Sequence, residues 1–140
     1  MTKNNTWTAS GLFSTVNTFF SPAYSVARRL EQLLAAELKD VPYKFQGAFA
    51  TVAIKDGASE IFHLDFNDKE GVWAFVFGVG DWSEGGDICL PQVGYRFAMK
   101  EGDVFAFPAK TFLHCATPVK KGTRYVFTLF MDKFLYNHAC

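Results

Sequence analysis

The chain has 140 residues, a length that predicts a single domain able to bury most of its surface around one core. Its formal net charge is zero, which excludes the overall basic field that gives proteins non-specific affinity for nucleic acids. Aromatic side chains make up 17% of the residues, a composition suited to well-packed β-sheets.

The sequence predicts neither a secretory signal nor a membrane span. Apolar residues near the N-terminus are interrupted by Ser, Thr and Asn, and no apolar run approaches membrane-spanning length. The cysteines, Cys89, Cys115 and Cys140, match neither a disulfide framework nor a zinc pattern. We therefore expect an intracellular protein, cytoplasmic or nuclear, with no membrane partner. The pattern leaves its oligomeric state open.

The first part of the chain is predicted to be an N-terminal arm over residues 1–20, followed by a helix over residues 22–39. The arm is polar and aromatic without a clear period. In the helix, Ser21 can act as the N-cap, Pro22 takes the first helical position, and apolar residues recur at three-and-four spacing. We expect residues 21–140 to form one domain in which this helix buttresses a sheet.

From about residue 45 onward, short β-prone runs alternate with breaks that contain glycine. Evenly spaced short strands of this kind predict an antiparallel sandwich or barrel. With about eight of them, a mainly β jelly roll (double-stranded β-helix) is the favoured fold. The runs cover residues 49–55, 60–65, 72–79, 87–91, 95–100, 103–109, 112–119 and 123–132.

The run at 60–65 contains an ionisable pair in an otherwise apolar stretch. On a strand, His63 and Asp65 point to the same face. The second and seventh strands of a jelly roll are neighbours, so an inward-facing His114 in the run at 112–119 could meet them. Two imidazoles and a carboxylate on one face of an octahedral ion are the arrangement that non-haem Fe(II) oxygenases use. The alternative is that HxD arises by chance and that these histidines are ordinary core or surface residues.

Arg124 lies near the start of the last run and shares a strand face with Val126 and Thr128. A guanidinium that faces into an apolar barrel needs an anion. Its fork of donors matches a carboxylate, so a dicarboxylate that binds the metal at one end and Arg124 at the other would satisfy both sites. The alternative is that Arg124 reaches solvent at the strand end, or pairs with Asp132 or Glu101.

The segment GVGDWSEGG (78–86) is predicted to connect two sheets. It contains neither GxGxxG nor GxxxxGK, so it is not interpreted as a phosphate-binding loop. Its Trp82 is available to cover the mouth of the barrel. Cys115 follows His114 directly and therefore points to the opposite face, so a Cys/His nucleophile pair is not predicted.

Five segments together resemble a known family, the Fe(II)/2-oxoglutarate-dependent dioxygenases, and are most similar to small fungal proteins related to its TET/JBP-like branch. They are HLD (63–65), EGGDICLP (84–91), GDVFAFPA (102–109), HCATPVKKGTR (114–124) and the closing YVFTLFMD. The resemblance implies a jelly roll in which iron is held by three side chains and the distal carboxylate of 2-oxoglutarate by a fourth. The implied metal ligands are His63, Asp65 and His114, and the implied co-substrate residue is Arg124.

The leading hypothesis is an oxygenase that uses Fe(II), 2-oxoglutarate and O₂ to hydroxylate an unidentified substrate, with release of succinate and CO₂. By the same resemblance a nucleobase is one candidate substrate, although the balanced charge weighs against tight duplex binding. The rival hypothesis is a non-catalytic jelly-roll binding or interaction module. It is favoured by the short chain and by Val126, because many relatives carry serine two residues after the arginine.

Overall fold

The computed structural model describes residues 21–36, 39–40 and 49–140. The arm predicted over residues 1–20 lies outside these described residues. Within them, the chain forms two helices and seven β-strands. In chain order the elements are α2 (Ser21–Leu33), β1 (Thr51–Asp56), β2 (Ala74–Gly80), β3 (Ile88–Leu90), a 3₁₀ turn (Pro91–Val93), β4 (Tyr95–Phe97), β5 (Val104–Phe107), β6 (Cys115–Ala116), β7 (Arg124–Phe130) and α3 (Lys133–Ala139).

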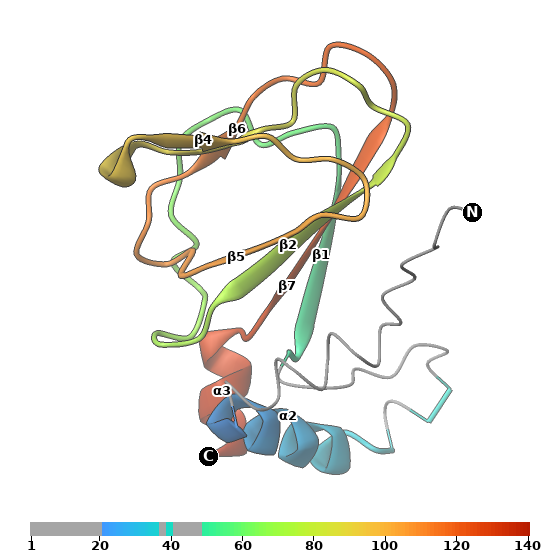
Figure 1. The fold of residues 1–140 in the computed structure, drawn as a ribbon. Coiled ribbons are helices and arrows are strands. Elements are labelled where there is room, and N and C mark those ends of the chain that lie inside the picture. Colours follow the sequence, from blue (N-terminus) through green and yellow to red (C-terminus); the bar gives the residue numbers. More distant parts are fainter. Residues whose placement is uncertain (1–20, 37–38, 41–48) are drawn as a thin grey trace, which may run out of the picture.

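The strands form two sheets that face each other across the middle of the molecule (Figure 1). The larger sheet has the strand order β1-β7-β2-β5, and the smaller sheet has the order β4-β3-β6. Every neighbouring pair of strands is antiparallel. This two-layer arrangement confirms the predicted mainly β jelly roll.

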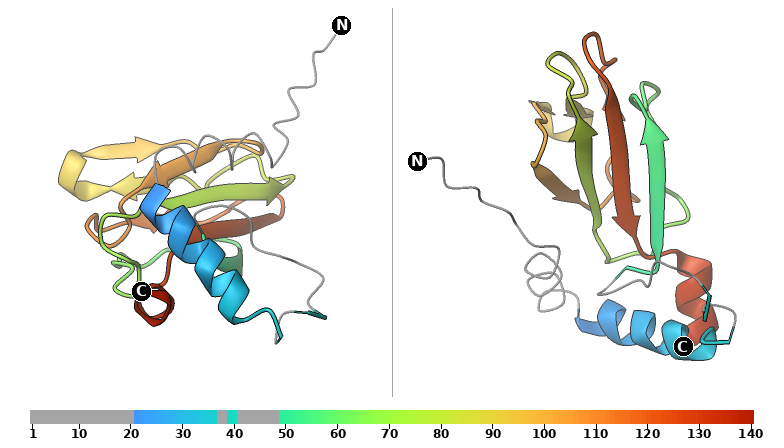
Figure 2. Two further views of the ribbon diagram at one scale, coloured as in Figure 1. Left: turned by 90° about the horizontal axis from the view of Figure 1, so that it is seen from below. Right: turned by 90° about the vertical axis from the view of Figure 1, so that its right-hand side faces the viewer.

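The two helices lie at one end of the larger sheet, where β1 and β2 begin and β7 ends (Figure 2). Helix α2 begins near the predicted position but ends at Leu33, earlier than the expected residue 39. Ala23 and Leu30 are buried, whereas Leu33 is 52% exposed, so continuing the helix beyond it would add little burial. Ala23 belongs to a core cluster with Phe49, Phe75, Leu129 and Met131.

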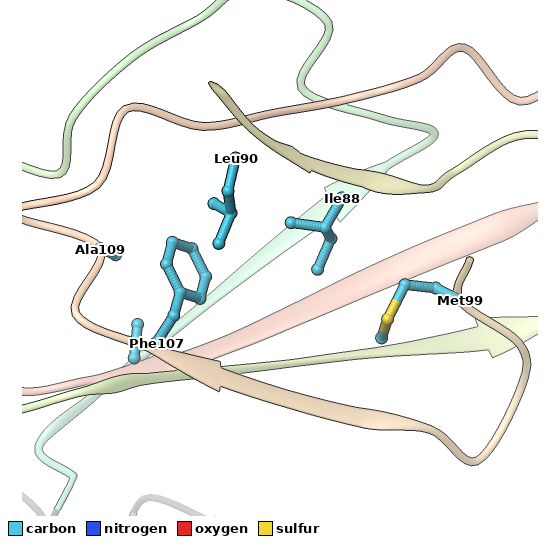
Figure 3. Packing of buried hydrophobic residues seen from close by; sticks show 6 residues of the cluster. Ile88, Leu90, Met99, Phe107 and Ala109 are labelled. Carbon is cyan, nitrogen blue, oxygen red and sulfur yellow. The ribbon is translucent and has the colours of Figure 1, made fainter. Parts of the chain in front are cut away.

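A second core cluster fills part of the space between the two sheets (Figure 3). Ile88 and Leu90 of β3 project from the smaller sheet toward Phe107 of β5 in the larger sheet, with Met99 and Ala109 beside them. Residues 88 and 90 share one face of their strand, and Cys89 takes the other. The remaining space between the sheets holds the candidate site.

The segment at 60–65, predicted as a strand, forms no strand and keeps a single isolated bridge between His63 and His114. These two residues exchange both backbone hydrogen bonds, each at 3.0 Å. The ladder does not continue, because the Ala116 N–H donates to the Ser59 carbonyl rather than to the Ile61 carbonyl that a regular register would supply. The Ile61 carbonyl instead contacts the His63 side chain.

The chain ends in a short helix, α3, that the sequence pattern did not predict. Asp132 is its N-cap, and its side chain accepts hydrogen bonds from the backbone N–H groups of Phe134 and Leu135. The helix packs beside α2 (Figure 1). Within the described part of the chain, no helix is both long and apolar enough to cross a lipid bilayer.

Candidate metal centre

Two histidines and one aspartate from distant parts of the chain converge between the sheets. His63 Nε2 lies 3.7 Å from Asp65 Oδ1, and His114 Nε2 lies 3.8 Å from Asp65 Oδ2. One potential ligand atom from each residue lies within 4.8 Å of the other two. Both separations are longer than a hydrogen bond, so neither imidazole satisfies the carboxylate. The structure thus brings together the three residues that the sequence singled out.

Backbone contacts position these side chains. The bridge between His63 and His114 holds the two histidines side by side, and their rings lie 4.3 Å apart between centroids. Asp65 is held by its own N–H, which donates to the Ala109 carbonyl at 3.1 Å. A tight turn follows, in which the Phe66 N–H donates to the Leu64 carbonyl. A bridge and a turn, rather than a regular strand, therefore bring the aspartate to the histidines.

The Nδ1 atom of each imidazole contacts a backbone carbonyl. His63 Nδ1 lies 2.8 Å from the Ile61 oxygen, and His114 Nδ1 lies 2.8 Å from the Phe112 oxygen. A carbonyl only accepts, so Nδ1 carries the proton in each neutral ring and Nε2 keeps its lone pair. Two Nε2 lone pairs and a carboxylate together form a ligand set that fits a divalent metal ion such as Fe(II).

Burial favours the metal-binding form of His114. It is the largest influence on this imidazole and lowers its pKa below the ordinary value of 6.5. The neighbouring His63 acts in the same direction, whereas the Phe112 carbonyl and the Asp65 carboxylate act in the opposite one. A neutral ring is the form required, because a protonated Nε2 has no lone pair to give to a metal.

Arg124 is a buried cation at the start of β7. It is 1% exposed, its Nη1 donates to the Gly57 carbonyl at 3.1 Å, and its Nε has no hydrogen-bond partner among the described residues. Burial lowers the pKa of Arg124 below its ordinary value, an effect that the Asp87 carboxylate partly offsets, but an arginine remains charged at neutral pH. A buried guanidinium with an unpartnered donor fits a carboxylate ligand. The alternative in which Arg124 reaches solvent is wrong.

One cavity, of about 500 Å³, is lined both by the three converging residues and by Arg124. Val126 and Thr128 line it from the same face of β7, as the alternation of that strand predicted. Lys55 and Ser59 line it as well, although the sequence pattern did not single them out. The signal for Lys55 is its place opposite Val126 in the register of β1 and β7, which is visible only once the strands are paired.

Cys115 lies next to His114 in sequence but interacts with a different partner. It is the register partner of Cys89 in the pairing of β3 with β6, and both cysteines are free thiols. Burial, followed by the neighbouring Cys89 thiol, raises the pKa of Cys115 above its ordinary value. A raised pKa leaves little of the reactive thiolate, which agrees with the prediction that Cys115 and His114 are not a nucleophilic pair.

The two facing antiparallel sheets, with a His-Asp-His triad between them, define a jelly roll with a candidate metal centre inside it. Among solved structures, the chain is similar to NgTET1 in complex with 5mC DNA, with a TM-score of 0.57 and 16% identity. That match covers 89% of this chain and 52% of NgTET1, so the chain spans about half the length of that protein.

A second similar structure is the 2OG complex of the viral collagen prolyl hydroxylase from Paramecium bursaria Chlorella virus-1. Its TM-score is 0.48 at 17% identity, and the match covers 75% of this chain and 69% of that one. No protein-family model matches the sequence. No curated protein matches it either. The structural likeness confirms the predicted resemblance at the level of the fold.

Proposed function

We propose that this protein is an Fe(II)/2-oxoglutarate-dependent oxygenase that hydroxylates a substrate with release of succinate and CO₂. The observation that carries the proposal is that one cavity holds two different binding elements. A convergent His-Asp-His set fits a divalent metal ion, and a buried arginine that lines the same cavity fits a carboxylate. A ligand with a chelating end and a carboxylate end would satisfy both.

Each of these residues has a defined role in the proposal. His63 and His114 present Nε2 lone pairs, and Asp65 supplies the negative charge that balances part of the charge of the ion. Arg124 binds the distal carboxylate of the co-substrate and orients it in the cavity. When bound, the metal and co-substrate supply the redox chemistry, in which one atom of O₂ enters succinate and the other enters the product.

The test is the anaerobic addition of Fe(II) and 2-oxoglutarate. We expect a visible charge-transfer absorption, because the band requires both ligands on one ion. His114→Ala should abolish it, and Arg124→Leu should weaken it by lowering affinity for the co-substrate. His138→Ala is the matched control, since His138 is exposed in α3 and lies outside the triad. A wild-type protein without the band, or a band that survives His114→Ala, would refute the proposal.

The alternative is a binding module without turnover, and Val126 is the observation that favours it. Val126 lines the cavity beside Arg124 and adds no hydroxyl group for the co-substrate carboxylate. Thr128 lines the same cavity and carries a hydroxyl that can take this role. Release of succinate from 2-oxoglutarate in air separates the two functions, because only the oxygenase produces it.

We infer that a nucleobase is the first substrate class to test. The support is that the NgTET1 structure contains 5mC DNA, while the balanced charge of this chain favours a free base or a single strand over a duplex. Succinate release would be compared with and without an oligonucleotide that contains 5-methylcytosine. Stimulation of turnover, together with a product heavier by one oxygen atom, is the expected outcome.

A further inference from the structure

Trp82 lies against the guanidinium of Arg124. The Cζ atom of Arg124 lies 5.3 Å from the centroid of the Trp82 ring, within the range of a cation–π interaction. Trp82 comes from the connection between β2 and β3, whereas Arg124 begins β7. Arg124 lines the cavity and Trp82 does not, so the indole covers a part of the arginine that the cavity does not reach.

Two glycines leave the space that this contact occupies. A Cβ atom at Gly78 would lie 2.6 Å from Cη2 of Trp82 and 3.2 Å from Nε of Arg124. A Cβ atom at Gly86 would lie 3.0 Å from both Cδ and Nε of Arg124. Any side chain at either position would therefore have to displace the indole or the guanidinium. The sequence GVGDWSEGG supplies the tryptophan and both glycines in one segment.

Hydrogen bonds alone do not fix the orientation of Arg124, so its contact with the Trp82 indole matters. Nη1 donates to the Gly57 carbonyl, and Nε has no hydrogen-bond partner among the described residues. One hydrogen bond does not fix a flexible side chain with three methylene groups, whereas an aromatic face beside the guanidinium restricts its rotation. The indole also keeps water from that part of the charge, which strengthens the interaction with an anion in the cavity.

We propose that Trp82 is a positioning residue for the co-substrate, which holds the guanidinium of Arg124 in place beside the cavity that this residue lines. This inference rests on the proposed function, because it takes the ligand of Arg124 to be the distal carboxylate of 2-oxoglutarate. The connection between β2 and β3 would then contribute to affinity for the co-substrate, whereas His63, Asp65 and His114 would contribute to binding of the metal.

The experiment measures binding of 2-oxoglutarate to the Mn(II)-loaded full chain by calorimetry, with Mn(II) binding measured separately. We expect Trp82→Leu to weaken 2-oxoglutarate binding about tenfold and to leave Mn(II) binding unchanged. Trp82→Phe keeps an aromatic face and should recover most of the affinity. Trp73→Leu is the matched control, because Trp73 is 44% exposed and lies before β2, and it should bind as wild type does.

Gly78→Ala gives a second route to the same result with the tryptophan in place. Its added methyl group would displace the indole, so we expect a similar loss of 2-oxoglutarate affinity in a folded protein. In turnover, both variants should raise KM for 2-oxoglutarate while kcat stays close to that of wild type. A fall in kcat with KM for 2-oxoglutarate unchanged would contradict a positioning role.

The outcomes separate the two proposals. If wild type binds 2-oxoglutarate and folded Trp82→Leu and Gly78→Ala bind it equally well, the role of Trp82 is overturned while the proposed function stands. If wild type binds Mn(II) but no 2-oxoglutarate, the proposed function fails and the inference fails with it. Circular dichroism of each variant shows whether it is folded, and Trp82→Phe tests the aromatic requirement if Trp82→Leu does not fold.

Discussion

Asp68 is a buried carboxyl group close to two other acidic side chains. It is 4% exposed, and its Oδ2 atom has no hydrogen-bond partner among the described residues. Burial, and then the charges of Asp65 and Asp132, raise its pKa from 3.8 to about 7, while Lys110 acts in the opposite direction. The folded protein therefore holds a proton on Asp68 at pH values where the unfolded chain has lost it.

This raised pKa predicts that the metal-free protein loses stability as pH rises. The contribution of Asp68 is complete below about pH 4 and is lost as pH rises toward about 7, by at most about 1.4 kcal/mol per pH unit. The asparagine in Asp68→Asn cannot ionise, so the urea midpoint of this variant should depend less on pH than that of wild type. At pH 8 the variant should have the higher urea midpoint. Equal pH dependence in the two proteins, measured with a chelator present, would contradict the prediction.

The convergence of the three residues proposed as metal ligands was predictable from the sequence, but the reason for their placement was not. Strand alternation put His63 and Asp65 on one face and therefore predicted that these two side chains lie close together. In the structure, the bridge to His114 and the turn after Leu64 bring them together. Asp68 and Trp82 were harder to assign, because an unsatisfied carboxyl and a covered guanidinium are defined by neighbours that are remote in sequence.

At the scale of secondary structure, α3 depends on a single capping residue. Asp132 Oδ1 accepts from the Phe134 N–H at 2.8 Å and from the Leu135 N–H at 3.1 Å. We expect Asp132→Ala to lower the free energy of unfolding by about 1 kcal/mol. Asp132→Asn removes the same charge but keeps a capping oxygen, so the difference between the two variants in urea unfolding isolates the cap. Equal unfolding midpoints would show that the cap contributes nothing measurable.

The strands were more predictable than the helix ends. Glycine-containing breaks separated the β-prone runs correctly, because several of those glycines adopt a left-handed backbone, among them Gly102 with φ 88° and Gly122 with φ 86°. The run at 60–65 failed as a strand because contacts with the histidine side chain and with Ser59 replaced the ladder. Helix α3 escaped detection because seven residues carry too short a period to recognise.

At the scale of the whole molecule, the ion is expected to stabilise the fold. The triad joins two segments that are far apart in sequence, so the unfolded chain does not present the same site. Metal at about 100-fold above its Kd should raise the melting temperature by about 10 °C. His114→Ala should lose this shift and His138→Ala should keep it, in anaerobic thermal scans with Fe(II) or Mn(II). An equal shift in His114→Ala would place the ion elsewhere.

The isolated bridge between His63 and His114 has a kinetic consequence. The same pair of main-chain hydrogen bonds that joins the two segments also holds two of the three residues proposed as metal ligands. A brief opening of the backbone there would separate both imidazoles in one event, without rotation of either side chain. The residence time of a bound ion would therefore follow the breathing rate of this bridge, and the ion in turn would slow amide hydrogen exchange at both positions together.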